Sequence, residues 1–165
     1  MDAELVVLRL LHIIPGVVWV GGAIFLAVIL EPNLRALGPA VQGPVMRKLA
    51  PVLVRYMSIA SFITIAAGIV LAFRVRSPSF WFDTGWGYAI LIGLIVSILG
   101  AATGGMTGAA AKKMENMAVA MEGRPPTPEE MAEMKETSEK LARLGRMTAV
   151  LVTIGVGTMA AARFV

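Results

Sequence analysis

Four long apolar runs divide the chain, and most charged residues lie between these runs or at their ends. The runs cover about residues 5–30, 52–73, 88–111 and 147–162. A transmembrane helix needs about 20 mainly apolar residues, and helices suit a bilayer because they satisfy their own backbone hydrogen bonds. The pattern therefore predicts an all-α protein, a four-helix transmembrane bundle that forms one integral membrane domain over residues 1–165.

The segment between the third and fourth runs, residues 112–146, is charged and amphipathic. Gly123 and the Pro125-Pro126 pair interrupt it, and the sequence "TPEE" that follows is typical of a helix start. Thr127 is placed to cap the helix and Glu130 to complete a capping box three residues later. We therefore expect the third and fourth spans to extend from the membrane as an antiparallel helical hairpin.

The distribution of positive charge predicts the orientation of the bundle. Of the 15 Lys and Arg residues, only Arg9, Arg74, Arg76 and Arg163 lie on the side that holds both termini. The others flank the first and third loops, and positive loops are typically cytoplasmic. We expect a multi-pass protein of the cytoplasmic (inner) membrane, with both termini outside and the hairpin in the cytoplasm. An aromatic belt at the outer interface is expected from Trp81, Trp86 and Tyr88.

Composition excludes several kinds of chemistry. Hydrophobic residues make up 57% of the chain, whereas soluble domains contain about 45–50%. Cysteine is absent and histidine occurs once, which excludes disulfides, iron–sulfur clusters, covalently attached c-type haem and a zinc motif. Topology accounts for the basic residues, so nothing indicates nucleic-acid binding, and the lipid bilayer is the first predicted partner.

The single histidine lies inside the first apolar run, in "LHIIPGVVWVGG". On a helix, His12 shares one face with Arg9, Gly16 and Trp19, since these residues follow one another at steps of three or four. Such a face offers an imidazole ligand, a cation for a propionate, a gap and an aromatic wall, which together suit a porphyrin. The competing interpretation is that His12 hydrogen-bonds a neighbouring helix. Ionisable groups inside a membrane are nevertheless a default indication of function.

Methionines and glycines have both chemical and structural interpretations. Thioethers bind Cu(I), yet methionines on the hairpin also suit its packing seam; these are Met114, Met117, Met121, Met131 and Met134. Glycines at four-residue spacing let membrane helices approach closely; these are Gly100, Gly104 and Gly108 in the third span, and we expect the same of Gly21, Gly22, Gly155 and Gly157. Packing is the favoured interpretation in both cases.

The order His12, Trp19, Gly21-Gly22, Pro32 and Arg35 resembles the first helix of the copper-resistance CopD family and of HemJ-like protoporphyrinogen oxidases. The resemblance covers roughly residues 8–35, and beyond it only the number of spans agrees. It implies a role for His12 in haem or metal binding.

The first functional hypothesis is a membrane b-type haem protein in electron transfer or a related redox step, which includes a haem-dependent oxidoreductase. Its axial ligand is His12, with Arg9, Gly16 and Trp19 as the pocket. The second ligand is the same histidine of another copy in a homodimer or other homo-oligomer, or a methionine such as Met57, Met106 or Met159. Without either, a single subunit would hold a five-coordinate haem. The alternatives are a non-enzymatic scaffold or accessory subunit that binds a partner through the hairpin, and copper handling with His12 as the metal ligand.

Overall fold

The computed structural model describes residues 2–76, 79 and 81–165. The described elements are all helical: α1 (Ala3–Phe25), a π-helical turn η1 (Leu26–Leu30), α2 (Glu31–Ala36), α3 (Pro39–Val75), α4 (Gly85–Ala120), α5 (Pro128–Ala161) and a final 3-10 turn η3 (Ala162–Phe164). Four helical stretches are long and apolar enough to cross a membrane. This confirms the prediction of an all-α chain with four spans.

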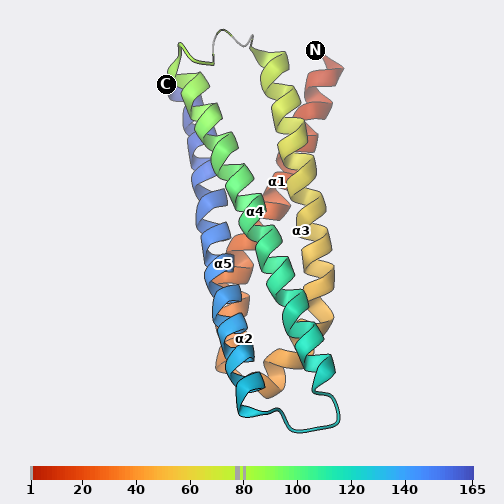
Figure 1. The fold of residues 1–165 in the computed structure, drawn as a ribbon. Coiled ribbons are helices and arrows are strands. Elements are labelled where there is room, and N and C mark those ends of the chain that lie inside the picture. Colours follow the sequence, from red (N-terminus) through yellow and green to blue (C-terminus); the bar gives the residue numbers. More distant parts are fainter. Residues whose placement is uncertain (1, 77–78, 80) are drawn as a thin grey trace.

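The long helices lie side by side, with both termini at one end of the bundle (Figure 1). We call this the terminal end. Helix α2 and the connection between α4 and α5 lie at the opposite end, the loop end. The principal packing partners are α4 with α5 and α1 with α3, and α3 also contacts α4. The bundle thus consists of two helix pairs that pack against each other.

The first span continues further than the sequence predicted. The first apolar run ends at about residue 30, but the chain stays helical through η1 and α2 up to Ala36, past Pro32. A proline lacks an N–H and its ring crowds the carbonyl four residues earlier. The wider π-helical turn directly before Glu31 relieves this crowding, because its hydrogen bonds skip one more residue. Nothing in the apolar pattern predicts this turn.

Helix α3 begins at Pro39 and is 37 residues long, so it also reaches the loop end. The sequence analysis expected only the third and fourth spans to extend there. Arg47 of α3 approaches Glu122, which lies two residues beyond the end of α4. The distance between Arg47 Nη1 and Glu122 Oε1 is 3.9 Å. The helical pair formed by residues 112–146 therefore has α3 beside it and does not stand alone.

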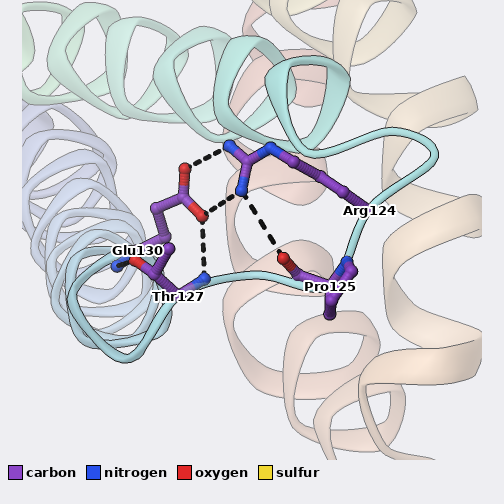
Figure 2. Close-up of polar contacts among 4 residues, drawn as sticks. All are labelled: Arg124, Pro125, Thr127 and Glu130. Carbon is purple, nitrogen blue, oxygen red and sulfur yellow. Dashed lines mark hydrogen bonds and ion pairs between the residues drawn. The ribbon is translucent and has the colours of Figure 1, made fainter.

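The turn between α4 and α5 is fixed by one carboxylate (Figure 2). The side chains of Thr127 and Glu130 form the predicted capping box, which is thereby confirmed. Arg124 donates to both oxygens of Glu130, with a distance of 2.8 Å from Nη1 to Oε2. The hydrogen bond from Arg124 and that from the Thr127 backbone lower the pKa of Glu130 from 4.5 to about 2.

The centre of the bundle is built from one tryptophan and smaller side chains around it. Trp19, Ala23, Ala60 and Val152 form its buried core. The glycines act as expected at several positions: a Cβ on Gly100 would lie 2.9 Å from Val152 Cγ1. Gly22, Gly108 and Gly155 also leave no room for a Cβ without adjustment, whereas Gly21 and Gly157 face open space. Close helix approach therefore explains only part of the glycine pattern.

The three residues expected to form an interfacial belt have different environments. Trp81 is buried, and its ring centroid lies 4.6 Å from that of Phe73. The Arg76 guanidinium lies over the ring of Trp86, with 5.1 Å between Cζ and the ring centroid. Only Tyr88 is exposed. Trp81 therefore packs the end of α3 instead of facing lipid.

Candidate functional site

His12 is held between α1 and α3. Its Nδ1 lies 2.8 Å from the backbone carbonyl oxygen of Thr64. The ring rests on Gly68, where a Cβ would lie only 2.7 Å from both Nδ1 and Cε1. Thr64 and Gly68 follow each other at i and i+4, so both face α1. An apolar helix thus carries one acceptor and one gap at the spacing that an imidazole needs.

The hydrogen bond defines the tautomer of the imidazole. A carbonyl oxygen only accepts, so Nδ1 carries a hydrogen and donates a hydrogen bond to the Thr64 carbonyl. The lone pair of neutral His12 is therefore on Nε2. Metal-binding histidines commonly have this arrangement, because a hydrogen bond from one ring nitrogen to a carbonyl fixes the tautomer and orientation of the other. His12 is partly exposed, and Nε2 has no hydrogen-bond partner among the described residues.

The other residues of the predicted pocket do not gather around Nε2. The gap expected at Gly16 is filled by the Thr64 methyl group, 3.3 Å from where a Cβ would be. Trp19 belongs to the buried core and is 4% exposed. Arg9 is exposed and forms no ion pair with a described residue. The inward face of α1 is therefore occupied by α3, and the flat gap that a porphyrin would need is not on this face.

The candidate methionine ligands lie in other environments. Met57 packs where a Cβ on Gly22 would be, and Met159 packs in the same way against Gly93 of α4. Met106 is 51% exposed. The side chains of Met57 and Met159 are therefore already packed into gaps beside glycines.

The hairpin methionines are divided between two surfaces. Met114 and Met134 line a cavity that α3 shares with α4 and α5. Met131 is 54% exposed. Across the described chain, no group of three His, Asp or Glu side chains is placed to hold a metal ion.

No family model, curated protein or solved structure matches the chain. The resemblance of residues 8–35 to CopD-like and HemJ-like proteins therefore stays a prediction. What the structure adds is the immediate environment of His12. The sequence analysis did not identify Thr64 and Gly68 as its neighbours, although the polar-x-x-x-glycine spacing in an apolar span was a usable signal.

Proposed function

We propose that the protein is an integral membrane b-type haem protein and that His12 is its axial ligand. The observation that supports this proposal is the hydrogen bond from Nδ1 to the Thr64 carbonyl, at 2.8 Å. It leaves Nε2 as an oriented, basic nitrogen, which is the form of imidazole that haem iron binds. A bound haem would supply one-electron or oxygen chemistry.

The surroundings of His12 fit the ligand nitrogen better than they fit a closed pocket. Gly16 and Trp19 are used for helix packing, so the macrocycle is expected at the open edge of the His12 ring, which is partly exposed. One chain provides one nitrogen ligand, so a second copy related by a two-fold axis would supply both the second His12 and the other wall.

The absorption spectrum of the purified full-length protein tests this proposal. We expect a Soret band, after haem is supplied if necessary, that is lost in His12→Ala. Imidazole added to His12→Gly should restore it, which separates loss of the ligand from loss of the fold. The Val156→Ala variant, at an exposed position of α5, keeps every contact of His12 and is the matched control. A wild type that stays colourless with haem, or a His12→Ala variant with an unchanged band, would refute the proposal.

A second candidate function is a non-enzymatic scaffold or accessory subunit that binds a partner at the loop end. The ordered, charged turn around Arg124 and Glu130 favours it, together with the exposed apolar side chains Val119 and Met131, each 54% exposed. Equal abundance of wild type and His12→Ala, together with a colourless wild type, would favour this alternative over the first.

The proposed orientation puts the loop end, including the hairpin, in the cytoplasm and both termini outside the inner membrane. The common end for the termini (Figure 1) and the predominance of Lys and Arg at the other support it. The chain has no cysteine, so single-cysteine variants can be labelled directly. In intact cells, a membrane-impermeant maleimide should label Asp83→Cys and leave Lys135→Cys unlabelled. The reverse pattern would overturn the orientation.

A further inference from the structure

Two contiguous cavities lie in the half of the bundle nearest the loop end. The inner cavity has a volume of about 180 Å³, is lined by all four spans, and extends from Trp19 to Glu31 along the first of them. The outer cavity has a volume of about 450 Å³ and lies between α3, α4 and α5, with Glu31 and Leu34 at its edge. Both are lined by Glu31, Val54 and Gly108, so the two cavities adjoin each other.

The inner cavity is apolar and is kept open by small residues. Gly105 and Gly145 line it, and a Cβ on either would meet nothing within 4 Å. The 12 residue-to-residue steps from Trp19 to Glu31 correspond to about 18 Å at helical rise, the scale of one extended hydrocarbon chain. Protein interiors contain few voids larger than a water molecule. A space of this size and polarity therefore suits an apolar chain.

Both carboxylates of the outer cavity already have cationic partners. Glu31 accepts from Arg35, with 2.8 Å between Oε1 and Nη2. Glu115 accepts from Lys112 of the same helix, at 2.9 Å. Neither acidic group therefore leaves an uncompensated negative charge beside the cavity.

Two arginines of α3 also line the outer cavity, and they give it a positive excess. Arg55 forms no ion pair with any described residue. Arg47 approaches only the exposed Glu122, at 3.9 Å. Basic pockets between membrane helices are typical sites for anionic headgroups.

We infer that the two adjoining cavities together bind a single-chain anionic amphiphile, such as a long-chain carboxylate or an alkyl phosphate. Its headgroup lies in the outer cavity near Arg47 and Arg55, and its hydrocarbon chain occupies the inner cavity toward Trp19. The inner cavity admits one chain, since its volume is below the usual range for drug-sized ligands. The site lies apart from the contact of His12 with α3, so it does not depend on the proposed haem.

Binding of a fluorescent C18 carboxylate, cis-parinaric acid, tests the inference in full-length protein held in phosphatidylcholine nanodiscs, with empty nanodiscs subtracted. Wild type should bind it saturably. Gly145→Leu fills the inner cavity and should weaken binding at least about tenfold, which corresponds to about 1.4 kcal/mol. Gly157→Leu is the matched control, because this glycine of the same helix also has open space but lies outside the cavity. It should bind as wild type does.

Headgroup recognition is tested with Arg55→Gln and the methyl ester of the same probe. The variant should bind the carboxylate several-fold more weakly and the uncharged ester as well as wild type does. Dodecyl phosphate should compete with the probe, whereas inorganic phosphate should not. The inference is overturned if Gly145→Leu and Gly157→Leu bind equally, or if inorganic phosphate competes as well as dodecyl phosphate. None of these results would change the spectrum expected from a haem at His12.

Discussion

The contact between His12 and Gly68 makes a quantitative prediction for Gly68→Ala. The added Cβ would lie 2.7 Å from Nδ1 and Cε1 of the imidazole. Ordinary van der Waals contact begins at 3.4 Å, so the ring would have to move by about 0.7 Å. The Nδ1–Thr64 bond, now 2.8 Å long, would then reach the limit of a hydrogen bond. The added methyl group therefore displaces the imidazole and weakens its hydrogen bond, while the His12 side chain itself is unchanged.

The expected free energy follows from three contributions. Overpacking in a close contact destabilises a protein by about 1–3 kcal/mol, and a lost hydrogen bond by about 1 kcal/mol. Alanine in place of a helical glycine offsets this by roughly 0.5–1 kcal/mol. We expect Gly68→Ala to lower the free energy of unfolding by about 1–3.5 kcal/mol. In a His12→Ala background, where the ring is gone, the same substitution should be neutral or stabilising.

The assay is a double-mutant cycle on the free energy of unfolding, measured by circular dichroism in mixed micelles of dodecylmaltoside and dodecyl sulfate. The coupling between His12 and Gly68 should be about 2–4 kcal/mol, the sum of overpacking and the lost hydrogen bond, well above the error of additivity for distant sites. Gly157→Ala, which meets no neighbouring atom, controls for the glycine substitution itself. Additive effects, or a Gly68→Ala variant as stable as that control, would refute the packing of His12 against α3.

Three further predictions use the same unfolding measurement or a titration. Gly155→Ala should destabilise the bundle by about 1–3 kcal/mol, because its Cβ would lie 2.9 Å from Ser97 Oγ; stability equal to wild type would contradict the close approach of α4 and α5. Thr127→Ala should cost about 1 kcal/mol through loss of the N-cap, and an unchanged unfolding curve would contradict the cap. Because the pKa of Glu130 is lowered to about 2, its contribution is complete above pH 4.5 and is lost as pH falls toward 2. Carbon-13 NMR of the Glu130 carboxyl should show this lowered pKa in wild type and a return toward the ordinary value in Arg124→Gln; an ordinary pKa in wild type would contradict the ion pair.

Much of the fold could be predicted because lipid restricts the alternatives. Each apolar run long enough to span had to be a helix, and the capping box at Thr127 is a local signal that requires only neighbouring residues. The first 13 residues of α3 were missed because Pro39, Pro44 and Pro51 resemble helix breakers. Pro39 starts the helix, where its missing N–H costs nothing. The other two lie inside α3, where packing against the neighbouring helices outweighs local propensity.

The surroundings of His12 could be predicted only in part. Periodicity shows which residues share a helix face, but it does not show which helix packs against that face. His12, Gly16 and Trp19 do lie on the side of α1 that turns toward the other helices. The same pattern fits a porphyrin surface and a seam with another helix equally well. Which of these forms depends on residues more than 40 positions away, Thr64 and Gly68, and no spacing within the first helix carries that information.

Glycine has opposite consequences in the two halves of the bundle. Near His12, the gaps at Gly16 and Gly68 are filled by a threonine methyl group and by the imidazole itself. Nearer the loop end, Gly105 and Gly145 face unfilled space. A rigid macrocycle therefore has to reach Nε2 at the partly exposed edge of the ring, whereas a flexible chain can enter the bundle from the loop end. The same residue type closes one half of the interior and keeps the other open, so the two proposed ligands do not compete for one site.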